Sequence, residues 1–270
     1  MNPFALGAAA ATAAGISARW NWWRPAAEGL PVLMYHKVGD PPPGSRLRPL
    51  WVSTEEFEWQ MRYLLRRGFA PMLFSELAAC EDGRAALPRK PVLVTFDDGY
   101  ANNYEEAFPV LARLRVKANI FIVVETVGSH NAWHDPESES WLRMLEWGQI
   151  SEMRDSGLVD FGSHTMRHRN LTEISIEDVR WEALESKRRL SERLGRDVTA
   201  FAYPYGAGAY DAGVRAAVRE AGYRHDFGIR QGFSPWPLRT DDGPLRRLYI
   251  RGDDSRFDFH LNATRGKARL

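Results

Sequence analysis

The feature of the sequence that most restricts the fold is a repeated alternation of short apolar runs with longer amphipathic segments. The clearest run, Val92–Phe96, is apolar and rich in β-branched residues, as expected of a strand covered on both faces. Strands are predicted near 31–36, 91–96, 118–124, 157–161, 199–203, 223–229 and 246–250, and helices near 53–67, 101–114, 147–156, 177–194 and 210–221. This order predicts parallel βα units, and the number of strands favours one α/β barrel over two separate domains.

Composition restricts the possible partners and metal sites. The 270 residues carry 36 basic and 35 acidic side chains, so a formal charge of +1 gives no reason to expect a nucleic-acid partner. Cys80 is the only cysteine, which excludes an intramolecular disulfide and a cysteine-rich metal site.

The N-terminus allows three interpretations. Phe4–Ile16 is an uncharged, alanine-rich stretch, followed by Trp20, Trp22, Trp23 and Arg24. The stretch is short for a transmembrane helix and lacks the preceding basic residues of a secretory signal, yet the tryptophans resemble an interfacial anchor. It is therefore a helix packed on the domain, a membrane-associated segment or an uncleaved export signal. We divide the chain into this segment, 1–28, and one catalytic domain, 29–270.

Several chemically reactive side chains closely follow predicted strands: His36, Asp97, Asp98, His164 and Tyr205. In α/β barrels the chemistry gathers at the C-terminal ends of the strands. Asp97-Asp98-Gly99 in isolation could be a plain turn. A pair of carboxylates at the end of a buried strand is costly, however, unless a cation or base lies nearby.

His164 and His168 are four residues apart, a spacing that on a helical turn directs both imidazoles to one metal ion. Thr165 follows His164 where zincins have a glutamate, so that type of site is excluded. Two histidines and one aspartate suit a catalytic zinc site and also a non-haem iron site. One of the two aspartates would bind the metal while its neighbour acts as a base on a water molecule.

Three sequence motifs resemble those of the polysaccharide deacetylases, carbohydrate esterase family four. They are Thr95–Gly99, His164–His168 and Phe201–Gly206, and they occur in the family's order. The resemblance covers about residues 30 to 252 and implies a distorted (β/α) barrel, expected to have seven strands. Leu33–Val38 further resembles the branch that deacetylates exported poly-N-acetylglucosamine.

The resemblance implies a role for each matching residue. Asp98, His164 and His168 would hold a divalent ion, usually zinc in this family, although cobalt or nickel can serve. Asp97 would be the general base, and the backbone N–H of Tyr205 would stabilise the oxyanion.

The sequence departs from the common family pattern at two positions. The late motif at Leu248–Asp253 lacks the histidine that usually protonates the departing amine, and His260 lies outside the pattern, so His36 is the predicted acid, as in the permuted branch. Ala202 stands where many members have an arginine that orients the base, and Arg247 is the candidate to replace it. Trp133 and Trp147 are candidate sugar-facing aromatic residues, with a core position favoured for Trp147.

The leading hypothesis is metal-dependent removal of N-acetyl groups from N-acetylhexosamine residues of a cell-envelope or exported polysaccharide, in a periplasmic or membrane-associated enzyme. A cytoplasmic location stays open. The alternatives are a deacylase of a lipid-linked amino sugar, held at a membrane by the N-terminus, and a non-catalytic carbohydrate-binding homologue. The intact base and ligands argue against the latter. An iron oxygenase is disfavoured because its ligands would not lie on βα strand ends.

Overall fold

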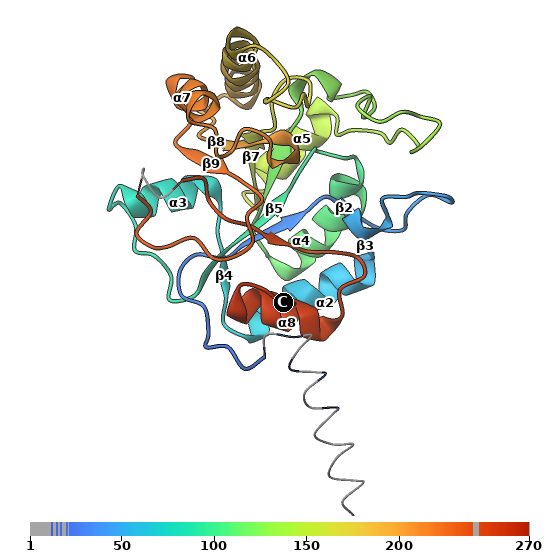
Figure 1. Ribbon diagram of the computed structural model, residues 1–270, viewed down its shortest axis with the longest axis vertical. Helices are drawn as coiled ribbons and strands as arrows, with labels where there is room; N and C mark the ends of the chain where they lie inside the picture. Colours follow the sequence, from blue (N-terminus) through green and yellow to red (C-terminus); the bar gives the residue numbers. More distant parts are fainter. Residues whose placement is uncertain are drawn as a thin grey trace, which may run out of the picture.

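The computed structural model describes residues 22–239 and 243–269, together with residues 12, 15, 17 and 20. Seven parallel strands form one sheet that curls into a half-barrel, with helices around it (Figure 1). In spatial order they are β10 (Leu248–Tyr249), β1 (Val32–Tyr35), β5 (Pro91–Phe96), β6 (Ala118–Ile122), β7 (Val159–Ser163), β8 (Ala200–Ala202) and β9 (His225–Phe227). The predicted barrel type and the seven strands are confirmed.

Short additional strands extend this framework. β4 (Ala70–Pro71) pairs with the start of β5, and β2 (Lys37–Val38) pairs with β3 (Trp51–Val52) outside the main sheet. A backbone bridge between Phe227 and Leu245 joins β9 to the segment that leads into β10. The two edges of the curled sheet are therefore brought together by the chain after β9.

The described helices largely follow the predicted order. They are α2 (Thr54–Arg66), α3 (Phe74–Glu81), α4 (Phe108–Leu114), α5 (Trp147–Asp155), α6 (Ile176–Leu194), α7 (Ala212–Glu220) and α8 (Arg256–Arg265), with short helical turns at Arg48–Leu50, Asn103–Ala107, Val124–Thr126 and Pro204–Gly206. Serine caps begin α2 and α6, and α6 ends at Gly195 in the left-handed conformation.

Two helices and several strand boundaries differ from the sequence predictions. α3 and α8 were not expected, and β7 lies two residues later than the predicted strand, at 159–163. No side chain of the N-cap residue Leu73 caps α3; instead Glu76 accepts a hydrogen bond from the Leu73 N–H at 3.0 Å. α8 carries a capping box, Ser255 with Asp258, which is a recognisable start signal.

The core has two layers because side chains alternate across each strand. Val92, Val94 and Phe96 of β5 pack between the sheet and the helices, whereas Leu93 belongs to the cluster inside the barrel. Phe74, Phe121 and Phe227 fill that interior with their rings in mutual contact. The interior is thus closed below the strand ends, and the ends themselves are left for chemistry.

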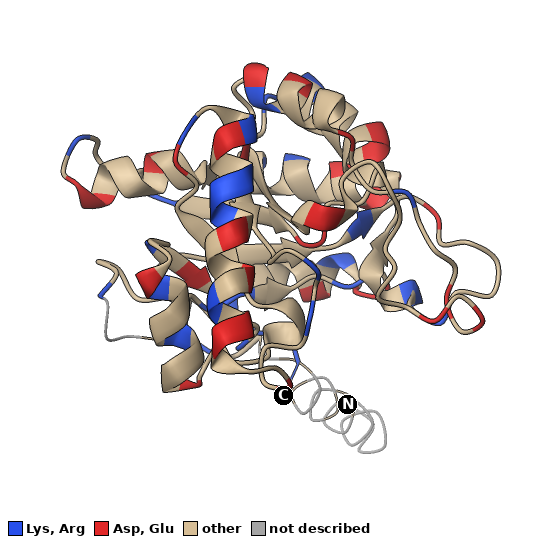
Figure 2. Ribbon diagram, turned by 90° about the horizontal axis from the view of Figure 1, so that it is seen from above, with Lys and Arg blue, Asp and Glu red and all other residues tan. Residues whose placement is uncertain are grey.

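The outer surface carries charges of both signs mixed along its helices (Figure 2). Nearly all of Phe4–Ile16 lies outside the described residues, so the division of the chain at residue 28 stays a prediction. Trp20 packs edge-on against Phe257 of α8 and its indole N–H donates to Asp258. In the part of the chain that is described, no helix has the length and apolarity needed to cross a membrane.

Candidate metal centre and catalytic pocket

Side chains from several strand ends meet in one cavity of about 410 Å³. The cavity lies at the C-terminal edge of the barrel, where β1, β5, β7 and β8 end. Its lining consists of Met34, His36, Leu47, Leu50, Asp97, Asp98, Trp133, His134, His164, His168, Tyr203, Tyr205, Ile229, Gln231 and Tyr249. All predicted site residues except Arg247 therefore line this cavity. Arg247 lies directly behind Asp97.

The two adjacent carboxylates face different partners because the strand ends in a tight turn. Asp98 has φ of 74° and Gly99 has φ of 81°. A Cβ at Gly99 would lie 2.9 Å from the Ile122 side chain, so the turn requires glycine both for its conformation and for space. The Asp97 carboxylate therefore contacts Arg247, whereas the Asp98 carboxylate contacts the two histidines.

Asp98, His164 and His168 form a buried cluster with the composition of a metal site. Asp98 Oδ1 lies 3.3 Å from His164 Nε2 and 3.2 Å from His168 Nε2. Ligands bonded at about 2.0–2.1 Å in a tetrahedral site are separated by roughly 3.3 Å, so these atoms suit an ion between them. The residues present therefore fit a divalent metal.

The contacts of the two imidazoles favour the tautomers that a metal requires. His164 Nδ1 lies 2.8 Å from the carbonyl oxygen of Ala202, which can only accept a hydrogen bond. The proton is therefore on Nδ1, and Nε2 keeps its lone pair toward Asp98. His168 Nδ1 lies 3.1 Å from the Tyr205 hydroxyl. Burial lowers the pKa of His168, which favours the neutral, ligating form.

The expectation that His164 and His168 share a helical turn is wrong. The segment after β7 is an irregular loop in which Thr165 and His168 have φ of 68° and 58°. The Thr165 hydroxyl accepts a hydrogen bond from the His168 N–H at 2.9 Å, and Thr165 N–H donates to the Ser163 hydroxyl. These local bonds, and not helical periodicity, bring the imidazoles to ring centroids 5.0 Å apart.

Asp97 forms a buried ion pair with Arg247. Arg247 Nη1 lies 2.5 Å from Asp97 Oδ1, and Arg247 Nε donates to the carbonyl of Gly228 at 2.8 Å. Burial raises the pKa of Asp97, but the charges of Arg247 and the nearby imidazoles outweigh burial, so that the pKa lies below its usual value. For Asp98 burial is likewise outweighed, by hydrogen bonds from His164 and His168, and its pKa lies well below its usual value.

His36 lies on the cavity wall after β1. Its Nδ1 is buried and has no hydrogen-bond partner among the described residues. Burial lowers its pKa, opposed by the charges of Asp98 and Asp97. Its place on the cavity wall, close to the two carboxylates, suits an imidazole that exchanges a proton with a bound molecule.

Of the remaining candidate residues, Trp133 and Tyr205 line the cavity, whereas Trp147 and His260 do not. The Trp133 ring stacks on His168 with centroids 4.3 Å apart and lines the cavity. Trp147 starts α5 and packs against the main core, as favoured from the sequence, and is not among the cavity's lining residues. Tyr205 has φ of 58° and is 55% exposed. His260 contacts the Tyr63 hydroxyl on the α2–α8 side of the molecule.

Sequence reasoning missed several lining residues because they lie in segments without a motif. Leu47 and Leu50 come from the short helical turn before β3, Ile229 and Gln231 follow β9, and Tyr249 ends β10. Their residue types are common in cores and loops, and nothing in their spacing indicates a cavity. His134 could have been predicted as a lining residue, since it directly follows the candidate Trp133 in a polar loop.

Comparison with known proteins gives consistent matches. The family model described as Polysaccharide deacetylase matches residues 84–225. The chain is 30% identical to the Bacillus subtilis protein YxkH over 72% of this chain and 62% of that protein. It is 26% identical to the poly-beta-1,6-N-acetyl-D-glucosamine N-deacetylase of Staphylococcus epidermidis, over 64% of each chain. It thus spans slightly less than two thirds of the length of these two relatives.

The solved structure of IcaB from Ammonifex degensii has a similar fold. It superposes with a TM-score of 0.69 at 30% sequence identity, and the match covers 88% of this chain and 96% of that one. The similarity therefore extends over most of this chain.

Proposed function

Because the chain belongs to the polysaccharide deacetylase family, we propose that it is a metal-dependent hydrolase that removes N-acetyl groups from N-acetylhexosamine residues of a glycan. The observation that carries the proposal is the buried Asp98–His164–His168 cluster beside the Asp97–Arg247 pair. The first group suits a metal, and the second keeps a carboxylate ionised next to it. Together they form the minimum equipment for hydrolysing an amide.

Asp98, His164 and His168 would hold the ion, for which zinc is our first choice and cobalt or nickel are alternatives. When bound, such an ion polarises a carbonyl oxygen and lowers the pKa of water.

Asp97 accepts the proton of the water molecule that attacks the acetyl carbon. The buried guanidinium of Arg247 keeps this carboxylate ionised and fixes its position, since Arg247 is itself held by the carbonyl of Gly228. Arg247 thus takes over the orienting role that an arginine at position 202 has in many family members.

His36 donates a proton to the departing amine nitrogen from the β1 side of the cavity. The amine is a poor leaving group unless it is protonated, and the carboxylates of Asp97 and Asp98 favour the protonated imidazole against the effect of burial. The Tyr205 N–H donates to the oxygen of the acetyl group as negative charge develops there.

The cavity wall suits a sugar ring. Trp133 provides an aromatic face, and Leu47, Leu50 and Tyr249 add apolar surface to the wall. With relatives named for poly-N-acetylglucosamine deacetylation, we take an exported or cell-envelope glycan containing N-acetylglucosamine as the substrate and the cell envelope as the location.

The test is acetate release from chitooligosaccharides, poly-N-acetylglucosamine and peptidoglycan fragments, with and without a chelator. We expect release from at least one substrate, its loss with chelator, and its return with added zinc. Asp97→Asn, which preserves shape but removes the base, should lower kcat by about 10²–10⁴-fold without loss of bound metal. Undiminished turnover in that variant, or no chelator-sensitive release from any substrate, would contradict the proposal.

A further inference from the structure

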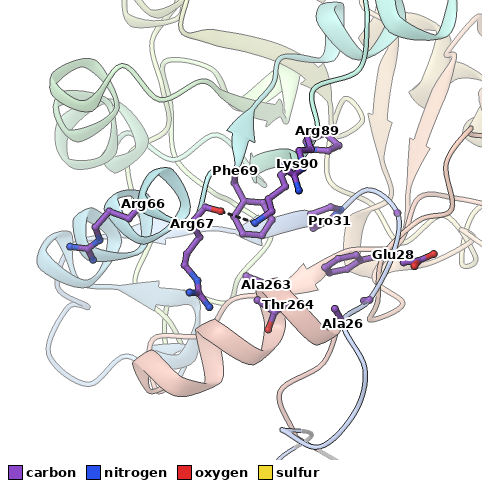
Figure 3. Close-up of a pocket in the computed structure, with 14 residues that line it drawn as sticks. Ala26, Glu28, Pro31, Arg66, Arg67, Phe69, Arg89, Lys90, Ala263 and Thr264 are labelled. Carbon is purple, nitrogen blue, oxygen red and sulfur yellow. Dashed lines mark hydrogen bonds between the residues drawn. The ribbon is translucent and has the colours of Figure 1, made fainter.

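A second cavity, of about 640 Å³, opens at the opposite edge of the barrel from the catalytic pocket. Its wall combines residues that precede β1 and β5 with the C-terminal end of α2 and part of α8 (Figure 3). The lining residues that matter here are Arg66, Arg67, Arg89 and Lys90, with Phe69 and Glu28.

The charge of this cavity is strongly one-sided. Four of its lining side chains are cationic, and Glu28 is the only acidic one. Figure 3 shows the Glu28 carboxylate directed away from the cations. Arg66 and Arg89 are exposed and have no ion-pair or hydrogen-bond partner among the described residues. Four cationic side chains against one carboxylate give this cavity a positive potential, which attracts anions.

The segment that forms one wall of this cavity continues into exposed tryptophans. Ala26 and Ala27 line the cavity, and the Ala27 N–H donates to the Thr264 carbonyl of α8 at 2.9 Å. A few residues earlier, Trp22 and Trp23 are 47% and 53% exposed. Tryptophan side chains exposed beside basic residues are typical of surfaces that meet a membrane interface.

We propose that this face docks on a lipid bilayer, with the phosphates of several anionic headgroups contacting Arg66, Arg67, Arg89 and Lys90. Guanidinium groups bind phosphate oxygens in pairs of parallel hydrogen bonds, and the two tryptophans enter the headgroup region beside them. The proposal does not depend on the catalytic function, because none of these residues lines the catalytic pocket.

Docking in this way directs the catalytic pocket away from the membrane. β5 starts at the basic cavity with Pro91 and ends at the catalytic pocket before Asp97, which separates the two by about 20 Å of strand. If the proposed function holds, the enzyme acts on a glycan outside the bilayer. A sugar linked to a lipid of the same bilayer would lie on the wrong side of the barrel.

The experiment measures binding of the full chain to vesicles of phosphatidylcholine with and without phosphatidylglycerol, by sedimentation. We expect binding that requires phosphatidylglycerol, and a fall of about 25-fold in partitioning for R66Q/R89Q, because each basic residue near an anionic surface contributes roughly fivefold. The matched control, R188Q/R189Q, removes the same charge from exposed positions on α6 and should bind as wild type. W22A/W23A should weaken binding to the same vesicles.

Three outcomes would overturn the proposal. The first is R66Q/R89Q binding as tightly as wild type, and the second is equal binding to neutral and anionic vesicles, which would indicate anchoring by the N-terminal segment alone. The third is calorimetric binding of inorganic phosphate that R66Q/R89Q abolishes, without any binding to vesicles, which would indicate a site for a soluble phosphate. Deacetylation of a soluble substrate by R66Q/R89Q should equal wild type, which separates failure of this proposal from failure of the proposed function.

Discussion

Replacing Arg247 with methionine tests how the site keeps its base ionised. Arg247 and Asp97 are both buried and lie 2.5 Å apart between Nη1 and Oδ1. The pKa of Asp97 lies below its usual value only because the cations around it outweigh burial. Without the guanidinium, burial dominates and the pKa rises. Because the ionised carboxylate is the base, the acid limb of kcat/KM should move to higher pH.

The size of the shift follows from the geometry of the pair. An arginine in contact with a carboxylate lowers the pKa of the carboxylate by about 1–3 units, so the acid limb of the Arg247→Met variant should move up by about that amount. Below the limb, kcat/KM falls about tenfold per pH unit. The free energy of unfolding should also fall by about 3–5 kcal/mol at neutral pH, since Asp97 would be a buried charge without its partner.

The assay is kcat/KM for acetate release across the pH range, with metal content measured at each step. Arg247→Lys is the control, since it keeps a cation but cannot contact both Asp97 and the Gly228 carbonyl as the guanidinium does. Its acid limb should stay close to that of wild type while kcat falls. If the methionine variant is folded and metal-loaded and its acid limb does not move, our account of Arg247 is wrong.

Three further results follow from the structure. His36→Ala should lower kcat on N-acetylated sugars far more than on an aryl acetate, whose leaving group departs without protonation; an equal loss on both would exclude His36 as the acid. Asp98→Asn should lose bound metal, measured by mass spectrometry, while unfolding cooperatively; full metal occupancy would contradict the ligand assignment. Burial raises the pKa of Asp254 to about 6, so the native state binds this proton more tightly than the unfolded state and stability falls as the pH rises from about 4 to 6. In urea unfolding, the free energy of unfolding of Asp254→Asn relative to that of wild type should therefore be about 1–2 kcal/mol higher at pH 7 than at pH 4, after allowance for solvent screening. A difference between the two proteins that does not depend on pH would disprove this.

The arrangement of the polar networks also explains why the site can be rigid without bound substrate. His164 is held by the Ala202 carbonyl, His168 by the Tyr205 hydroxyl, and Asp97 by Arg247. Position 202 thus contributes through its backbone where other family members use a side chain. The loss of the arginine there is compatible with an ordered base because Arg247 approaches from the other side of the barrel.

The strands and the polar residues at their ends could be predicted without a structure. The apolar run before Asp97 and Asp98 indicates a buried strand with a polar end from neighbouring residues alone. Two histidines at close spacing likewise indicate a pair of metal ligands without information from the rest of the chain. The helical turn predicted for His164 and His168 was wrong. In this loop, hydrogen bonds to the side chains of Thr165 and Ser163 replace helical hydrogen bonds, and residue spacing alone does not predict them.

Contacts between residues far apart in the chain could not be predicted, because they depend on how the elements pack. Arg247 and Asp97 are 150 residues apart, and their contact depends on the sheet curling until β10 lies beside β1. The same curling brings Leu47 and Tyr249 onto one cavity wall and gathers Arg66 and Arg89 at the opposite edge. Periodicity fixes which face a residue occupies within its own strand or helix, whereas the distance between elements is set by how all of them pack together.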